Sequence, residues 1–415
     1  MRLFQSFYEL EREILSKVTL NFKEIDKTYS RNFRKVLSSF IEEKVSSHQL
    51  DPSFGYGLFD SGTQITERVF AKVFNTEKAI IRPQIVSGTQ ALFLILNSLL
   101  QRGDLLLSVT GEPYETLKAC IGIIKNYKGT LLERGVRYSE VSLISKDVFD
   151  YEADLIKDAK LVWIQKSCGY SSRKTISNRE IDRLIRIVRT HNPRCIIAVD
   201  NCYGEFIEED EPTNYECDVL GGSLLKNPGG GLAKTGGYIV GKGEIIERIA
   251  SYLIAPGLGF ETTPNLGFTR EILQGLFNSP QSVKEALKGN IYISCFLEML
   301  GIESEPRYFE PHYDIILKIK MRTEKFFKAF INAIQEVSPL DSNAFPAPFI
   351  QEGYSSPIVM AGGTFTPGSS IEFSADGFYK SPFEIYYQGG LYFEQSRVLA
   401  EKFLTKIYDC NNASL

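Results

Sequence analysis

Two charged side chains follow apolar, strand-like segments and could together bind a small molecule. Asp200 ends the segment "CIIAVD", and Lys226 lies in the glycine-rich segment "GGSLLKNPGGG". Burying a carboxylate is costly unless a cation or a hydrogen-bond donor lies against it, although an isolated Asp here could simply cap a turn. Glycines around a lysine let the backbone approach a ligand closely, whereas most lysines on such loops only face solvent. Because both residues follow predicted strands, a shared ligand-binding site is favoured over a separate turn cap and a separate surface lysine.

A hydroxyl group completes a recognisable layout, because Ser223 lies three residues before Lys226. An acid after one strand, a lysine after the next and a hydroxyl beside it are expected of a pyridoxal 5'-phosphate site. In such a site the acid pairs with the pyridinium nitrogen, the lysine forms the Schiff base and the hydroxyl binds the phosphate. We therefore expect Lys226 to be the functional lysine of this segment, and Lys234 and Lys242 to be structural or on the surface.

Two further segments follow predicted strands. The segment "SGTQ" (87–90) opens a helix, and the backbone amides of a helix start with the hydroxyls of Ser87 and Thr89 suit a phosphate, although an ordinary N-cap explains them as well. Tyr114 follows the strand-like "LLLSV", so its ring could lie flat on a pyridine ring or could only fill space. Its position after a strand favours stacking modestly.

The elements that must position these residues alternate along the chain. Helix-like segments at 91–101 and 177–191 lie between short apolar segments, which predicts an α/β fold with a mostly parallel sheet flanked by helices. Such sheets bind ligands outside the carboxyl ends of their strands. The predicted strands are 79–86, 105–109, 161–165, 195–200, 218–223 and 236–241.

Three parts are expected from the pattern of the whole chain. Residues 1–52 read as a helical N-terminal arm, and 53–255 as the large cofactor-binding α/β domain. Residues 256–415 read as a small C-terminal α/β domain, with long helical segments around 280–300 and 313–336 and strands near 344–375.

Composition excludes several classes of function. The chain has 43% hydrophobic and 24% charged residues and a net charge of −4. It therefore lacks the excess of positive charge that binding to nucleic acid or to an anionic membrane would favour. Its three histidines lack metal-site spacing and its seven cysteines include no C-x-x-C pair, so neither a metal site nor a disulfide scaffold is expected. The start of the chain does not read as a signal peptide, and we expect a cytoplasmic protein that acts on a small molecule.

Two short motifs suggest other functions and fail on context. Residues 236–242 match G-x-x-x-x-G-K, but Gly243 replaces the Ser or Thr that would hold magnesium, and the segment looks like a strand. Ser223 and Lys226 match the S-x-x-K of penicillin-recognising enzymes, but the companion S-D-N and K-T-G motifs do not follow.

The chain resembles the fold-type I pyridoxal phosphate enzymes, and among them the methionine γ-lyase-like proteins described as cystathionine β-lyase relatives involved in aluminium resistance. The resemblance covers nearly the whole chain. The segments that carry it are "RPQIVSGTQA" (82–91), "GEPYETL" (111–117), "VDNCYGEF" (199–206), "GGSLLKNPGGGLAKTGGYIVGK" (221–242), "MAGGTF" with "GSSIEFSADG" (360–377) and "YYQGGL" (386–391). The segment around the lysine is the most specific of them.

The resemblance implies roles for individual residues. Lys226 would be the Schiff-base lysine, Asp200 the pyridinium partner and Tyr114 the residue over the ring. The phosphate would lie among Ser87, Gly88, Thr89 and Ser223. Relatives are dimers or tetramers with sites at a subunit boundary, which implies a homodimer or homotetramer in which Tyr56 reaches the neighbour's phosphate.

Two positions depart from the family pattern. Thr63 in "GYGLFDSGTQ" and Cys168 in "IQKSCGYSSR" stand where relatives commonly carry arginine. The partner of the substrate carboxylate is open, with Arg397 and Arg173 as candidates.

The leading hypothesis is a carbon–sulfur lyase that eliminates a β- or γ-thiolate from a sulfur-containing amino acid such as cystathionine, cysteine or methionine. Lys226 would abstract the Cα proton with a pKa lowered by partial desolvation, and Asp200 would keep the ring nitrogen protonated. Three alternatives remain: an aminotransferase on the same scaffold, a cofactor-binding protein with little turnover, and a nucleotide-binding protein that uses residues 236–242.

Overall fold

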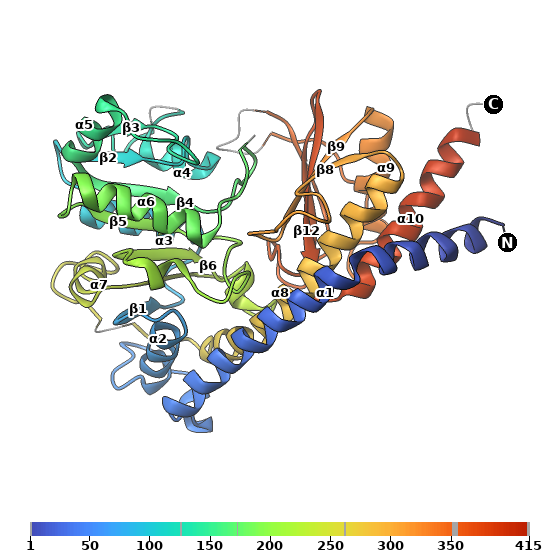
Figure 1. The fold of residues 1–415 in the computed structure, drawn as a ribbon. Coiled ribbons are helices and arrows are strands. Elements are labelled where there is room, and N and C mark those ends of the chain that lie inside the picture. The colour runs from blue at the N-terminus through green and yellow to red at the C-terminus, as the bar shows by residue number, and fades with distance from the viewer. Residues whose placement is uncertain (1, 125–126, 172, 261–262, 351–355, 413–415) are drawn as a thin grey trace. The chain divides into compact units, whose positions relative to one another are not determined.

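The computed structural model describes residues 2–124, 127–171, 173–260, 263–350 and 356–412 (Figure 1). The chain forms two compact units. The seven-stranded unit is Asn32–Phe277, and the five-stranded unit combines Met1–Arg31 with Asn278–Leu415. The unit boundaries fall inside the long helices α1 (Arg2–Glu42) and α8 (Thr269–Met299), and so differ from the divisions expected after residues 52 and 255.

The larger unit is built on a mixed sheet with the order β1-β7-β6-β5-β4-β2-β3. Strand β7 runs antiparallel to both of its neighbours, and the pairs among β3, β2, β4, β5 and β6 are parallel. The predicted mostly parallel α/β fold is thus confirmed. The strands are β1 (Lys78–Ile81), β2 (Leu105–Ser108), β3 (Arg137–Glu140), β4 (Ala159–Gln165), β5 (Ile196–Asp200), β6 (Val219–Ser223) and β7 (Gly237–Gly241).

Helices cover this sheet in layers (Figure 1). Buried residues of α3 (Gly88–Leu99), α4 (Glu115–Ile121) and α7 (Gly243–Ala250) share one hydrophobic cluster with the sheet. Helix α5 (Asp150–Asp158) packs against α6 (Asn178–His191), whose apolar residues are buried as their helical spacing predicts. The remaining elements are α2 (Ser61–Val73) and the short 3-10 helices η1 (Ser47–Leu50), η2 (Pro212–Tyr215) and η3 (Asn227–Gly229).

The first strand is shorter than predicted. A strand over 79–86 is expected from the sequence, but β1 ends at Ile81. Pro83 lacks the N–H group that a strand interior needs, so the chain leaves the sheet there and turns toward the start of α3.

The smaller unit holds an antiparallel sheet with the order β10-β11-β12-β9-β8. The predicted helix over 313–336 is wrong in its first part, because Ile316–Met321 form β9 and the helix α9 covers only Glu324–Glu336. Pairing of β9 with both β8 and β12 outweighs the local helical pattern. The other elements are β8 (Glu303–Glu305), β10 (Ile358–Ala361), β11 (Phe373–Phe378), β12 (Phe383–Gly390) and α10 (Phe393–Asn412).

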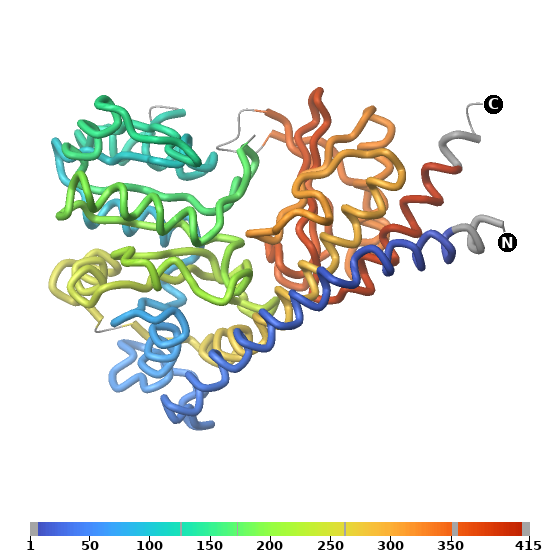
Figure 2. The backbone as a smooth tube through the Cα atoms, in the orientation of Figure 1, coloured from blue at the N-terminus to red at the C-terminus, as the bar shows by residue number. Residues whose placement is uncertain are grey.

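Segments far apart in the sequence build the core of this unit (Figure 2). Phe7, Ile14 and Val18 of α1 belong to the same buried cluster as Phe296 of α8 and Phe403 of α10. The N-terminal arm therefore packs as part of a folded unit. None of the helices in the described ranges is both long and apolar enough to cross a membrane.

Candidate functional site

The carboxyl ends of the parallel strands bring the predicted residues to one edge of the sheet. Gln165, the last residue of β4, pairs in register with Asp200, the last residue of β5. Asp200 in turn pairs with Gly221 of β6, two residues before Ser223. Three neighbouring strands thus end side by side, as the fold rule for parallel sheets requires.

The expected phosphate-binding segments contact each other directly. Ser87 caps α3, and its Oγ accepts a hydrogen bond from the backbone N–H of Gln90 at 3.1 Å. A Cβ added to Gly88 would lie 2.6 Å from the Cβ of Ser223, so only glycine allows this approach without a shift. Ser223 Oγ accepts from the N–H of Leu225 at 3.1 Å. The start of α3 and the end of β6 therefore form one cradle.

Tyr114 is anchored at both ends. Its backbone N–H donates to Gln165 Oε1 at 2.8 Å, and its hydroxyl donates to Thr89 Oγ1 at 2.9 Å. Thr89 also lies 3.1 Å from the hydroxyl of Thr116. Burial and the nearby charge of Asp200 raise the pKa of the phenol, so Tyr114 stays neutral at physiological pH. The ring thus joins the cradle to the end of β4.

Asp200 is a deeply buried acid, with 2% of its surface exposed. Its Oδ1 accepts a hydrogen bond from the backbone N–H of Cys202 at 3.0 Å. Burial raises the pKa of this carboxyl, and the charge of Lys226 opposes the increase. A cationic N–H group on a ligand would lower that pKa again, which is what a carboxylate partner of a pyridinium nitrogen requires.

Lys226 lies between β6 and η3, and its Nζ stands over the ring of Tyr203, 3.7 Å from the centroid. The sequence predicts a lowered pKa for this amine, and the structure contradicts that prediction. Burial does lower the pKa, but electrostatic interactions with Cys202, Tyr203 and Asp200 raise it by more, so it lies above its usual value. Lys226 is therefore held as an ammonium ion at neutral pH.

The glycines after Lys226 are required by backbone packing. A Cβ on Gly229 would lie 1.7 Å from the carbonyl oxygen of Leu224. Gly230 has φ +53°, and its added Cβ would lie 2.3 Å from the carbonyl oxygen of Gly275 in α8. The lysine turn is thus pressed against the backbone of α8, where no side chain fits.

These features fit a pyridoxal phosphate group. The cradle offers three hydroxyls and the N-terminus of the 12-residue helix α3, which suits a phosphate. Asp200 suits a cationic ring nitrogen, and Lys226 supplies the amine that an aldehyde needs. The predicted residues Ser87, Gly88, Thr89, Tyr114, Asp200, Ser223 and Lys226 all belong to this one arrangement.

Tyr56 is not part of the cluster within one copy of the chain. Its side chain is 73% exposed in the turn before α2. The proposal that it reaches the phosphate of a neighbouring copy stays a prediction.

Thr63 has a structural role in the first turn of α2. Its backbone N–H donates to Asp60 Oδ1 at 2.9 Å, and its hydroxyl donates to Asp60 Oδ2 at 2.8 Å. Asp60 also accepts hydrogen bonds from Ser53 and Asn265, which fastens the loop before α2.

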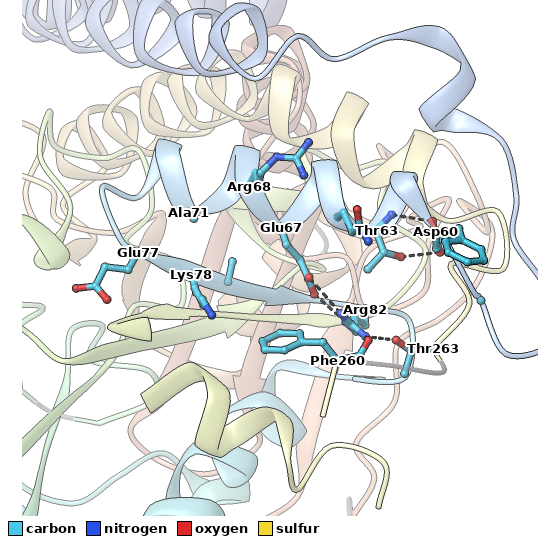
Figure 3. A pocket seen from close by; sticks show the side chains of 14 residues that line it. Asp60, Thr63, Glu67, Arg68, Ala71, Glu77, Lys78, Arg82, Phe260 and Thr263 are labelled. Carbon is cyan, nitrogen blue, oxygen red and sulfur yellow. Dashed lines mark hydrogen bonds and ion pairs between the residues drawn. The ribbon is translucent and has the colours of Figure 1, made fainter. Parts of the chain in front are cut away.

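A cavity of about 310 Å³ lies beside this cap, between α2 and the edge strand β1 (Figure 3). Arg82, which the sequence analysis does not single out, lines it with 3% exposure and binds both carboxylate oxygens of Glu67. The guanidinium also donates to the carbonyl of Phe260 at 2.7 Å. Lys78 at the other end pairs with Glu247, and Arg68 pairs with Glu43, so the cations that line this cavity are all held in ion pairs.

The two arginine candidates for the substrate carboxylate differ in their surroundings. Arg397 binds Glu11 and Glu394 within the five-stranded unit. Arg173 donates to the backbone carbonyl of Gln165 at 2.7 Å, so it lies at the site's edge of the sheet. Cys168 belongs to the same loop, and its N–H donates to Thr175 Oγ1 at 3.0 Å.

The nucleotide-binding alternative does not fit the structure. Residues 237–241 form the antiparallel strand β7 rather than a phosphate-binding loop. Lys242 Nζ lies 2.6 Å from Asp218 Oδ1, and Lys234 pairs with Glu271 at 2.8 Å. Both lysines are engaged in ion pairs, which suits the structural or surface roles expected of them.

Three residues of the site escape prediction from sequence. Gln165 orients Tyr114, Tyr203 lies under Lys226, and Glu205 lies buried behind Gly222, with its Oε1 2.9 Å from an added Cβ there. Tyr203 and Glu205 belong to the quoted segment "VDNCYGEF". Their closeness to Asp200 along the chain is the one sequence feature that could have placed them in the site.

Sequence relatives and solved structures are similar to this chain over most of its length. The uncharacterized protein YnbB of Bacillus subtilis is 41% identical over 373 residues, which cover 89% of this chain and 89% of YnbB. A carbon-sulfur lyase involved in aluminum resistance from Clostridium novyi NT is 38% identical with a TM-score of 0.92, over 97% of this chain and 96% of that chain. A protein from Listeria innocua, named as a candidate cystathionine beta-lyase involved in aluminum resistance, is 38% identical with a TM-score of 0.92, over 96% of this chain and 98% of that chain.

More distant structures show the fold class. The pyridoxal-5'-phosphate dependent protein YhfS of Escherichia coli has 15% identity and a TM-score of 0.63, over 93% of this chain and 97% of that chain. This likeness confirms the expected fold-type I architecture. The family model for methionine gamma-lyase matches residues 7–408. The chain therefore belongs to the methionine gamma-lyase family, as its resemblance predicts.

Proposed function

We propose that this protein is a pyridoxal 5'-phosphate-dependent carbon–sulfur lyase that acts on a sulfur-containing amino acid such as cystathionine, cysteine or methionine. One observation carries the proposal: Asp200, Tyr114 and Lys226 are held around the ends of neighbouring strands. The N–H of Tyr114 donates to Gln165, which pairs in register with Asp200, and the N–H of Lys226 donates to the carbonyl of Ser223, which lies against Gly88 of α3. Family membership and the carbon-sulfur lyase from Clostridium novyi NT support the reaction type.

Each residue has a defined task in the proposed reaction. Ser87, Thr89 and Ser223 bind the phosphate, and Asp200 holds a proton on the ring nitrogen. The cofactor, when bound, supplies an electron-withdrawing ring that stabilises negative charge at the substrate Cα and allows a thiolate to leave. Nζ of Lys226 would take the Cα proton only after losing its own, because the amine is an ammonium ion at neutral pH in the protein without cofactor. Tyr114 would orient the bound ring from the cradle.

The test begins with the absorption spectrum of the purified protein. We expect an absorption band at about 420 nm from a covalently bound cofactor. The Lys226→Ala variant should lack this band. Lys234→Ala, in the same segment but paired with Glu271, should keep the band. A band that survives Lys226→Ala would contradict the assignment of this lysine.

Product analysis then separates the reaction types. Cystathionine, cysteine and methionine should each be tested for release of keto acid and ammonia, and elimination requires both without an added keto acid. Turnover that depends on an added keto acid would favour an aminotransferase, and a bound chromophore without turnover would favour a cofactor-binding protein.

We also propose that the protein is a homodimer or homotetramer. Four apolar side chains within six residues before α2 are exposed: Phe54 at 68%, Tyr56 at 73%, Leu58 at 63% and Phe59 at 96%. Exposed apolar groups gathered in one loop are typical of an interface. Light scattering should report two or four copies, with a smaller mass for Phe59→Ser, and a monomeric wild type would contradict the proposal.

A further inference from the structure

The amine of Lys226 is held by an aromatic face. Its Nζ lies over the ring of Tyr203, 3.7 Å from the centroid. A cation within about 6 Å of such a centroid is attracted by the electron-rich face, and the attraction grows where water is excluded. Lys226 is partly buried, and Leu224 and Asn227 of its turn are fully buried, so the contact is shielded from much of the solvent.

Tyr203 reaches this place in an unfavourable backbone conformation. Its φ is +69°, and Phe206 in the same loop has φ +62°. Bulky residues rarely adopt left-handed angles, and such strain persists only where the surrounding structure enforces it. The loop after Asp200 is therefore held in shape by its surroundings.

Buried side chains supply that restraint. Asn227, the residue after Lys226, is fully buried, and its Nδ2 donates to the carbonyl of Tyr203 at 3.0 Å and to that of Glu205 at 2.9 Å. Asn32 Nδ2 donates to the carbonyl of Phe206 at 3.0 Å. Because Asn227 adjoins the lysine, its hydrogen bonds hold the backbone of the lysine turn beside the loop that carries Tyr203.

We propose that Tyr203 is a positioning residue, which holds the ammonium form of Lys226 against its ring face and sets how readily the amine gives up its proton. The claim that Tyr203 affects catalysis rests on the proposed function, whereas the claim that its ring binds the ammonium group does not. The other titratable groups that act on this amine are Asp200 and Cys202 beside Tyr203, and Tyr114 at α4. Glu205 acts electrostatically on it from the same loop.

The test measures the amine itself, on protein freed of any cofactor. Modification of Lys226 by an amine-reactive reagent, followed by peptide mass spectrometry from pH 7 to 11, gives its apparent pKa. Tyr203→Phe keeps the ring face and loses only the phenol hydroxyl, so it should lower the pKa of Lys226 less than Tyr203→Leu does. Tyr203→Leu should lower it, with between about twofold and thirtyfold more neutral amine at a given pH.

Phe206→Leu is the matched control, because it removes an aromatic ring at a left-handed position of the same loop without touching Lys226. Its pKa for Lys226 should match the wild type. Fluorinated phenylalanines at position 203 keep the shape of the ring while weakening its face, so they also serve where Tyr203→Leu does not fold. The pKa of Lys226 should fall stepwise with each added fluorine.

An unchanged pKa in Tyr203→Leu or in the fluorinated series would overturn the proposal, as would Tyr203→Phe behaving like Tyr203→Leu. The turnover of thiol amino acids is measured separately. A protein without lyase activity whose Lys226 pKa follows fluorination would refute the proposed function and leave this inference standing, and the converse result would do the opposite.

Discussion

Glu205 is a buried acid near the site, and in the part of the chain that the structure describes it has no ion-pair partner to compensate a negative charge. Glu205 is fully buried, and its Oε1 accepts a hydrogen bond from the hydroxyl of Tyr238 at 2.6 Å. Its Oε2 has no hydrogen-bond partner among the described residues. Burial raises the pKa of this carboxyl to about 8. Glu205 is therefore a neutral acid at pH 7, unlike an acid that is held in an ion pair.

This acid makes stability depend on pH. Between its unfolded pKa near 4.5 and its folded pKa of about 8, the folded state binds more protons than the unfolded state. Stability should therefore fall as pH rises through that window, by up to about 1.4 kcal/mol per pH unit. Glu205→Gln should remove this slope in urea unfolding measured from pH 5 to 8. The exposed Glu244→Gln serves as the control, and a slope that survives Glu205→Gln would refute the prediction.

The contact between α3 and β6 is the element-scale feature on which the cradle depends. Gly88→Ala would place its Cβ 2.6 Å from the Cβ of Ser223, so the helix start must move away from the strand end. We expect a loss of about 1–3 kcal/mol in the free energy of unfolding and a weaker hold on the cofactor.

The double variant Gly88→Ala with Ser223→Gly removes the opposing Cβ and provides the control. It should recover part of the lost stability in denaturant unfolding. Equal stability of Gly88→Ala and wild type would show that the two elements do not constrain each other.

Local patterns predict the elements better than they predict the contacts between them. The apolar segments that end at Asp200 and Ser223 are strands as expected, and the helical spacing of 177–191 matches α6. The helical pattern is wrong for Ile316–Met321, because the pairing of this segment with two strands lies outside any local window of sequence.

The site residues likewise divide into those that a local sequence pattern predicts and those that depend on contacts between elements. Asp200 and Lys226 stand out because charged residues follow apolar strands. The role of Gln165 depends on its register with Asp200 in the next strand. That of Tyr203 depends on a left-handed angle in a residue that is not glycine, which no sequence pattern encodes.

At the scale of the whole molecule, the two units should respond differently to acid. His312 belongs to the five-stranded unit, and both of its ring nitrogens are buried. Burial lowers the pKa of this imidazole to about 4. The folded unit therefore resists protonation of a ring that the unfolded chain protonates readily.

The sign of the effect follows from this difference. Between pH 6.5 and about 4 the unfolded state binds more protons, so the stabilisation present above pH 6.5 should be lost as pH falls through that window. Hydrogen exchange should show earlier opening of the five-stranded unit at pH 5 than at pH 7, and His312→Phe should reduce the difference. The half-buried His191→Gln in the other unit is the control. An equal acid response of His312→Phe and wild type would contradict this account.

The cap at the start of α2 also constrains how this lineage could change. Thr63 is 5% exposed, and both its N–H and its hydroxyl are committed to Asp60. A long cationic side chain introduced there would have to leave the interior and would forfeit the hydroxyl bond. A single Thr63→Arg substitution would thus unfasten the loop before it could add any ligand contact, so such a change needs compensating changes at Ser53 or Asn265 first.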